Sequence, residues 1–193
     1  MAIHYLKKAS KTAEADTASI AGTVASMLAE IENRGESSAL DYARKLDGYD
    51  GPIEISSADI KAAADQLPAK LKADIQFAHG NIRRFAEAQK ATLHETEIEP
   101  GLMAGQKLIA CNAAGCYVPG GRYSHIASAM MTVTTAKVAG CRHISVCSPP
   151  RPGVGVHPAI IYTANLAGAD RIYAIGGVQA VAAMTFGYFG MPK

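Results

Sequence analysis

The chain has 193 residues, of which 49% are hydrophobic and 19% charged, and its formal net charge is +2. No apolar run reaches the roughly 18–20 residues that span a bilayer, and basic residues form no stripe, so neither a membrane nor a nucleic acid is an expected partner. The opening residues, MAIHYLKKASK, lack the apolar stretch of a secretory signal, which favours a cytoplasmic protein.

Residues 1–91 form the first predicted region, and their apolar side chains recur at helical spacing. Glycines at positions 35 and 48 and the Gly51-Pro52 pair separate successive helical segments. The predicted helices begin at Asp16 or Thr17, at Glu36, at Ser56 or Ser57, and close to Pro68. We therefore expect a helical N-terminal region.

Residues 92–114 change from helical to extended periodicity. Thr96 and Ile98 alternate with polar residues, Glu99-Pro100-Gly101 has turn chemistry, and Leu108-Ile109-Ala110 is a second apolar run. This pattern predicts a β-hairpin whose second strand covers Leu108–Ala110.

Residues 115–193 alternate between strands and helices. The predicted strands lie near 115–118, 144–147 and 172–175, and the helices cover about 124–139, 156–166 and the residues from 178 onward. Such alternation is typical of a parallel sheet with helical crossovers. The predicted fold class is therefore α/β, with a Rossmann-like unit after the helical region and the hairpin.

The cysteines and histidines give no metal-binding pattern. The four cysteines, Cys111, Cys116, Cys141 and Cys147, include no CxxC pair, and their contexts favour buried thiols over zinc ligands or disulfides. The histidines show neither HxH nor HExxH spacing. We therefore predict no metal site built from this chain alone.

Three loops follow the predicted parallel strands, at 119–125, 148–155 and 176–179. Ligands of open parallel sheets bind at this edge. Gly120 and Gly121 can adopt backbone angles closed to other residues, and the helix starting near Ser124 offers free N–H groups to an anion. The alternative interpretation is a tight strand-to-helix turn in which Ser124 caps the helix.

Two further groups in these loops have both a functional and a structural interpretation. Arg122 and His125 beside a helix N-terminus form a plausible receptor for a carboxylate, sulfonate or phosphate, but a solvated arginine and a histidine near the cap need no ligand. In the IYAIGGVQ segment, Gln179 places an amide in the first turn of the next helix, where it is either a ligand contact or a polar surface residue.

Two stretches, CYVPGGRYSHIASAMMTVTTAKVAGCRHISVCSPP and GADRIYAIGGVQAVAAMTFG, resemble the cofactor-binding half of the histidinol dehydrogenase family. The resemblance implies an NAD-dependent, zinc-requiring dehydrogenase that oxidises a primary alcohol through an aldehyde to a carboxylic acid in two hydride steps. It also implies that Tyr117 and Gln179 contact NAD and that Gly120 and Gly121 let the cofactor approach.

The residues after the PGG turn point to the substrate. Family members usually carry small and apolar residues there, whereas Arg122-Tyr123-Ser124-His125 resembles the sulfopropanediol dehydrogenase branch, whose substrate, dihydroxypropanesulfonate, is a small anion. Arg122, Ser124 and His125 are therefore candidate substrate residues. Histidinol is a cation, which an arginine would repel. Two alternatives stay open: histidinol oxidation in histidine biosynthesis, and a non-catalytic nucleotide-binding or assembly module.

Family members run to more than twice this length. The resemblance places their catalytic Glu-His pair, their zinc ligands and a further NAD-contacting asparagine after the position of Lys193. We therefore assign no catalytic residue and no metal ligand here. We expect an N-terminal portion whose Rossmann-like unit is incomplete, an isolated chain that is inactive, and a homodimer for the full-length form.

Overall fold

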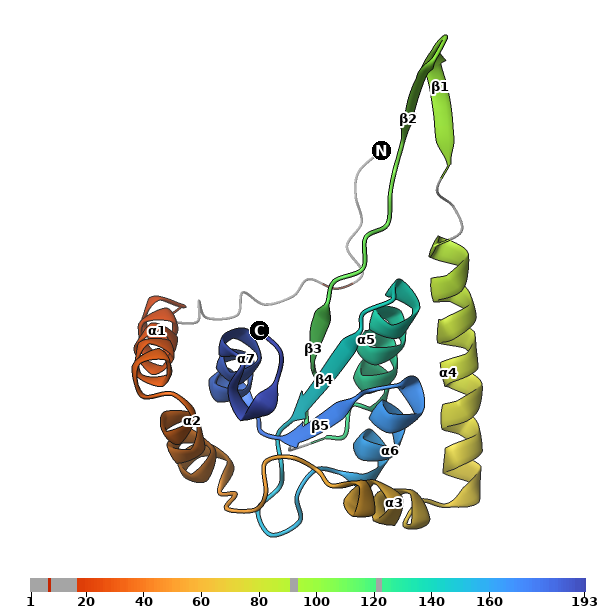
Figure 1. Cartoon of the computed structure of the whole chain (residues 1–193). Coiled ribbons are helices and arrows are strands. Elements are labelled where there is room, and N and C mark those ends of the chain that lie inside the picture. The colour runs from red at the N-terminus through yellow and green to blue at the C-terminus, as the bar shows by residue number, and fades with distance from the viewer. Residues whose placement is uncertain (1–6, 8–16, 91–93, 121–122) are drawn as a thin grey trace.

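A computed structural model describes residues 7, 17–90, 94–120 and 123–193, and its first part is helical. Figure 1 shows helices α1 (Thr17–Arg34), α2 (Glu36–Tyr42), α3 (Ser57–Asp65) and α4 (Ala69–Lys90) in this order. A π-helical turn, η1 (Ala43–Asp47), continues α2 and ends at Gly48, whose φ of 60° is left-handed. The helical N-terminal region is thus confirmed, but the sequence pattern did not reveal η1.

The start of α3 follows from local side-chain chemistry. The Ser56 hydroxyl accepts a hydrogen bond from the backbone N–H of Asp59 at 3.1 Å, and the Asp59 carboxylate accepts one from the Ser56 N–H at 3.3 Å. This capping box satisfies two N–H groups that the helix itself leaves free. The predicted start at Ser56 or Ser57 is confirmed.

The predicted hairpin is present, but its second strand lies earlier than expected. Strand β1 (Glu95–Glu99) pairs antiparallel with β2 (Leu102–Gly105), and Gly101 turns the chain with a φ of 85°. The prediction of a strand over Leu108–Ala110 is wrong, because the short Pro100-Gly101 connection places the partner strand directly after it.

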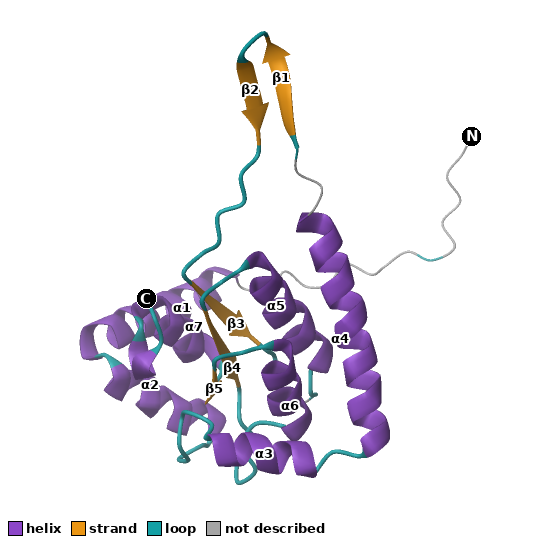
Figure 2. Cartoon of the chain, turned by 45° about the vertical axis from the view of Figure 1, so that its right-hand side comes forward, coloured by secondary structure: helices purple, strands orange, loops and turns teal. Residues whose placement is uncertain are grey.

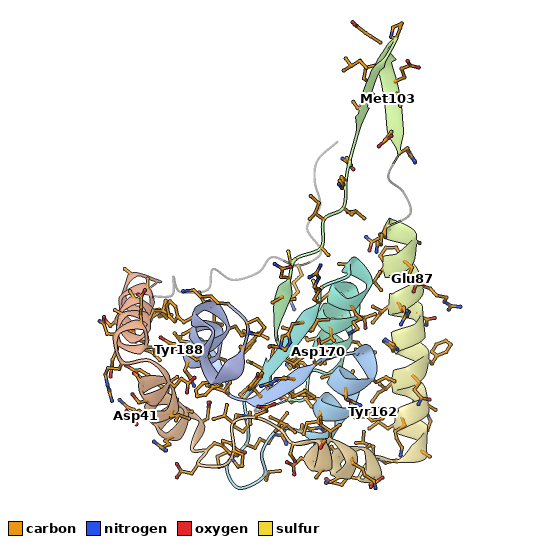
Figure 3. The ribbon with its side chains drawn as sticks, in the orientation of Figure 1. Asp41, Glu87, Met103, Tyr162, Asp170 and Tyr188 are labelled. Atoms are coloured by element: carbon orange, nitrogen blue, oxygen red, sulfur yellow. The ribbon has the colours of Figure 1, made fainter. Side chains whose placement is uncertain are left out.

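The hairpin stands apart from the rest of the fold. All residues of β1 and β2 are exposed. Figure 1 shows the hairpin projecting beyond the end of α4, and Figure 3 places Met103 on this projection, distant from the other labelled side chains. It therefore adds nothing to the core described below.

The second half contains the predicted parallel sheet. Strands β3 (Ala113–Tyr117), β4 (His143–Ser148) and β5 (Arg171–Ala174) are hydrogen-bonded in the order β3-β4-β5. Helices α5 (Ile126–Ala139), α6 (Pro158–Ala167) and α7 (Gly177–Phe186) follow them, and a 3₁₀ turn, η2 (Tyr188–Gly190), comes last. The α/β class with a Rossmann-like unit is confirmed.

Helices cover both faces of this sheet. Figure 2 shows α5 and α6 on one face, with α3 and α4 outside them, and α7 on the other face, with α1 and α2 outside it. The main core lies between the sheet and α5 and α6, and includes the fully buried Ile144, Val146 and Ile160. Because the N-terminal helices pack on both sides, they sandwich the parallel sheet. The predicted boundaries at 91 and 114 stay predictions.

A short N-terminal segment also extends the sheet. The backbone N–H of Ile55 donates to the carbonyl of Ile172 at 2.9 Å, and that of Ala174 donates to the carbonyl of Ile53 at 2.7 Å. These bonds, with an antiparallel bridge between Glu54 and Tyr173, cover the outer edge of β5. They pair residues about 120 positions apart, which local periodicity cannot predict.

The cysteines only partly match the expected core role. All four are free thiols; Cys116 and Cys147 are buried, Cys141 is half-buried and Cys111 is exposed. Burial, with a smaller effect of the nearby Cys116, raises the pKa of the Cys147 thiol to about 12. The core role is therefore wrong for Cys111, which precedes β3 on an exposed connection. None of the described helices is long and apolar enough to cross a membrane.

Candidate functional site

The carboxyl ends of the three parallel strands lie at one edge of the sheet, and the loops that leave them meet there. Val118 continues the β3 pairing, donating its N–H to the carbonyl of Cys147 at 2.9 Å. Gly120 lies in the loop after β3 and Gly176 in the loop after β5, and both pack against Pro149, which lies in the loop after β4. The predicted convergence of the three loops is therefore present in the structure.

Pro149 is the contact point between two of the predicted glycine turns. A Cβ on Gly120 would lie 2.9 Å from the Pro149 carbonyl oxygen and 3.0 Å from the Ser148 hydroxyl, and a Cβ on Gly176 would overlap the Pro149 ring. The φ angle of Gly120 is not positive. The absent side chain at Gly120 thus permits tight loop packing. The expected special backbone angle is wrong for this glycine.

Tyr117 links the first turn to the last. It is the final residue of β3, it is half-buried, and its hydroxyl accepts a hydrogen bond from the backbone N–H of Gly177 at 3.2 Å. Gly177 is the first residue of α7, so this bond satisfies one of the N–H groups that a helix start leaves free. Two residues predicted from separate motifs therefore lie in direct contact.

We expect Tyr117→Phe to lower the free energy of unfolding by about 0.5–1.5 kcal/mol, because it removes this acceptor and keeps the ring. The backbone N–H of Gly177 should exchange with solvent faster. Urea unfolding and NMR hydrogen exchange measure the two effects. Tyr162→Phe is a matched control, since its hydroxyl contacts Gln76 at 3.1 Å and not the turn. Equal Gly177 exchange in both variants would contradict the assigned contact.

Gln179 is fully buried in the first turn of α7, so the surface-residue interpretation of this glutamine is wrong. Its side-chain Nε2 donates to the carboxylate of Asp47 at 3.0 Å. Asp47 is the last residue of the π-helical turn η1, 132 positions earlier. Sequence reasoning missed Asp47; its only signal was its place at the end of a helical segment, directly before Gly48.

The environment of Asp47 alters its proton affinity. Burial raises the pKa of the Asp47 carboxyl above its ordinary value, although hydrogen bonds from Gln179 and from the backbone N–H of Gly176 favour the ionised form and act against that rise. The carboxylate therefore faces both the glutamine and the glycine turn. Asp47 joins the N-terminal helical region to the edge of the sheet.

The other predicted residues of the first loop are only partly described. Gly121 and Arg122 lie outside the described residues, so the structure does not place them. Ser124 is half-buried and His125 is exposed. The interpretation of Ser124 as the helix cap is wrong, because His125 occupies the N-cap position of α5, without a side-chain cap bond.

A cavity of about 440 Å³ lies away from these loops, between α4, α5 and α6. Its lining includes the cations Arg83, Lys90 and Lys137. Arg83 pairs with Glu87 at 2.9 Å, and Lys90 donates to the carbonyl of Val138 at 3.2 Å. The cavity lies at the C-terminal end of α5, whereas the loop 119–125 precedes the N-terminal end of that helix. The cavity therefore contains none of the predicted site residues.

Comparison with known proteins identifies the family. A family model described as histidinol dehydrogenase matches residues 10–193. The chain belongs to the histidinol dehydrogenase family. It is 64% identical, over its whole length, to the sulfopropanediol 3-dehydrogenase of Ruegeria pomeroyi and covers 45% of that protein. It is 37% identical to the histidinol dehydrogenase of Methanosarcina barkeri, with 90% of this chain and 41% of the relative covered.

A solved structure supports the same assignment. The crystal structure of histidinol dehydrogenase from Elizabethkingia anophelis matches with a TM-score of 0.85 and 33% identity. The match covers 97% of this chain and 42% of that chain. The chain therefore spans less than half the length of these relatives.

The edge described above is chemically suited to the NAD that the family implies. Two buried polar atoms there, the Ser148 hydroxyl and the Gln179 Oε1, have no hydrogen-bond partner among the described residues. The loops also contain glycines, and α7 begins at this edge with its N–H groups. Unpaired polar atoms, small residues and a helix N-terminus are the features that bind the hydroxyl, amide and phosphate groups of a dinucleotide.

Zinc does not fit the described part of the chain in the same way. Within residues 17–90, 94–120 and 123–193, no group of three or more His, Cys, Asp or Glu side chains is placed to hold a metal ion. Zinc sites in proteins need three or four such ligands. We therefore derive no step through zinc, and the absence of metal binding by this chain stays a prediction.

Proposed function

We propose that this chain carries part of the NAD site of a dehydrogenase that oxidises a small anionic alcohol, such as dihydroxypropanesulfonate, to a carboxylic acid. The observation that supports this most is the contact between Tyr117 and Gly177 beside the buried Gln179, because it joins two motifs that the family uses for its cofactor. The 64% identity to a sulfopropanediol 3-dehydrogenase supports the choice of branch.

NAD, when bound, would supply the hydride acceptor for the alcohol carbon. The residues of this chain would bind and orient it. The Tyr117 hydroxyl accepts a hydrogen bond from the Gly177 N–H and so fixes the start of α7, whose N-terminus lies at this edge. The Ser148 hydroxyl and the Gln179 Oε1 are buried at this edge without a hydrogen-bond partner among the described residues, and an N–H or O–H group of the cofactor would satisfy them.

The substrate would lie on the α5 side of this edge. His125 is exposed at the start of α5, and Arg122 and Ser124 are its close neighbours in sequence. A guanidinium can donate two parallel hydrogen bonds to a sulfonate, and an imidazole and a hydroxyl add further polar contacts. The same arginine disfavours histidinol, which is a cation, so we rank histidinol oxidation second. We further propose a homodimer for the full-length protein.

We expect this chain to bind NAD weakly, with a dissociation constant of about 0.1 mM or weaker, equivalent to about −5.5 kcal/mol. The binding should be weak because the chain covers less than half of its relatives and carries only some of the expected contacts. Isothermal titration calorimetry with NAD measures the affinity. Submicromolar binding would contradict a partial site, and no detectable binding at NAD concentrations of several millimolar would contradict the proposed function.

A further inference from the structure

The amide group of Gln179 has two different environments on its two sides. The Nε2 donates to the Asp47 carboxylate, whereas the Oε1 is buried and has no hydrogen-bond partner in the described part of the chain. The amide packs against Gly177 with its oxygen nearer: a Cβ placed on that glycine would be 3.0 Å from the Oε1 and 3.4 Å from the Nε2. Gly177 itself is exposed, whereas the Gln179 side chain beside it is fully buried.

Asp47 determines which side of the amide faces Gly177. An ionised carboxylate can only accept hydrogen bonds, so it pairs with the NH₂ group of a glutamine and not with the oxygen. The opposite orientation would place two unpaired oxygens against each other and would leave the NH₂ group buried without a partner. The orientation that presents Oε1 to the turn therefore depends on the charge state of one side chain.

We propose that Asp47 is a positioning residue of the cofactor site, which holds the Gln179 amide so that its oxygen is presented at Gly177 as an acceptor for an N–H or O–H donor of NAD. The inference rests on the proposed function for the identity of the ligand. The donors that NAD offers are its carboxamide, its adenine amine and its ribose hydroxyls. Asp47 itself contacts the turn at the backbone N–H of Gly176 and affects NAD binding through Gln179.

A purely structural role fits Asp47 less well. Burial raises the pKa of its carboxyl, which means that the protein environment on balance disfavours the ionised form. A group whose folded-state pKa is raised lowers stability progressively as the pH rises from the unfolded-state pKa to the folded-state pKa. Ionisation of Asp47 near neutral pH therefore does not add to the stability of the fold. A loss of NAD affinity without a loss of stability would separate positioning from folding.

The first measurement is NAD affinity in matched variants, by calorimetry or ligand-observed NMR. Asparagine at position 47 can pair with either side of the Gln179 amide, so Asp47→Asn should weaken NAD binding by up to about tenfold, the effect of losing one hydrogen bond to the Gln179 oxygen. Asp50→Asn is the control: Asp50 lies three residues further on, its side chain is 83% exposed, and its partner is Arg44. That variant should bind within about twofold of the unaltered chain, because its ion pair lies on the surface.

The second measurement needs no ligand. Solvent exchange of the Gln179 side-chain NH₂ protons should be about tenfold faster in Asp47→Ala, which removes the acceptor, and intermediate in Asp47→Asn. Unchanged exchange in Asp47→Ala would overturn the inference whatever the NAD result. Equal NAD affinity in Asp47→Asn and Asp50→Asn would also overturn it. Failure of the unaltered chain to bind NAD would instead contradict the proposed function and the ligand named for this acceptor, while proton exchange would still decide whether Asp47 holds the amide.

Discussion

Gly176→Ala should lower the free energy of unfolding by about 3 kcal/mol, because the added methyl group would overlap the Pro149 ring. The Pro149 Cα lies only 2.9 Å from the position of the new Cβ, so rotation of a side chain cannot relieve the overlap. The turn after β5 and the loop after β4 would have to separate. For a chain of this length the thermal midpoint should fall by roughly 6–12 °C.

Gly80→Ala is the matched control for this substitution. Gly80 lies inside α4, and no atom comes within 4 Å of the position that its Cβ would take. Alanine favours a helix over glycine by about 1 kcal/mol, so this variant should be equally or more stable. Thermal unfolding of both variants followed by circular dichroism measures the difference. A similar midpoint for the two variants would contradict the close packing of the two loops.

Arg122→Ala should reduce kcat/KM toward dihydroxypropanesulfonate by roughly ten- to a hundredfold in the full-length enzyme. Its guanidinium would donate paired hydrogen bonds to two sulfonate oxygens, and such charge-assisted contacts contribute about 1.5–3 kcal/mol. His125→Ala should act in the same direction but less, since an imidazole offers fewer hydrogen-bond donors than a guanidinium. Steady-state kinetics on the purified full-length enzyme measure both effects.

Two comparisons decide whether Arg122 recognises the anion. Activity toward an uncharged alcohol of similar size should change little in Arg122→Ala, because that substrate never used the contact. Arg142→Ala serves as a control at an exposed arginine before β4, at the opposite edge of the sheet. Equal losses on charged and neutral substrates would show that Arg122 holds the loop or the cofactor, and anion selection would have to be abandoned.

Local sequence patterns predicted most of the fold because each element carries its own signals. Gly35 and Gly48 end helices with positive φ angles, and Ser56 caps α3. The second strand of the hairpin was predicted too late in the chain, because the apolar run at 108–110 resembled a strand more than Leu102–Gly105 did. The pairing of Ile53 and Ile55 with β5 was missed because no local pattern encodes a partner about 120 residues away.

The candidate site was predicted only where its residues belong to sequence motifs. Tyr117 ends a strand, Gly120 lies in the turn that follows it, and Gln179 comes directly after the second glycine turn; the structure places all three at the same end of the sheet. Asp47 lies in a different region, at the end of a π-helical turn, and meets Gln179 only in the folded chain. Likewise, the reason for glycine at position 120 became evident only from its contact with Pro149.

Chemical-shift mapping on the ¹⁵N-labelled chain would show whether NAD binds at the carboxyl ends of β3, β4 and β5. Titration with NAD should shift the backbone amides of Gly120, Gly176 and Gly177 and leave those of Lys90 and Lys137 nearly unchanged. The latter two line the basic cavity between α4, α5 and α6, which is the alternative place for the phosphates of a dinucleotide. Shifts confined to that cavity, with the glycine turns unaffected, would mean that NAD does not bind at the carboxyl ends of the strands.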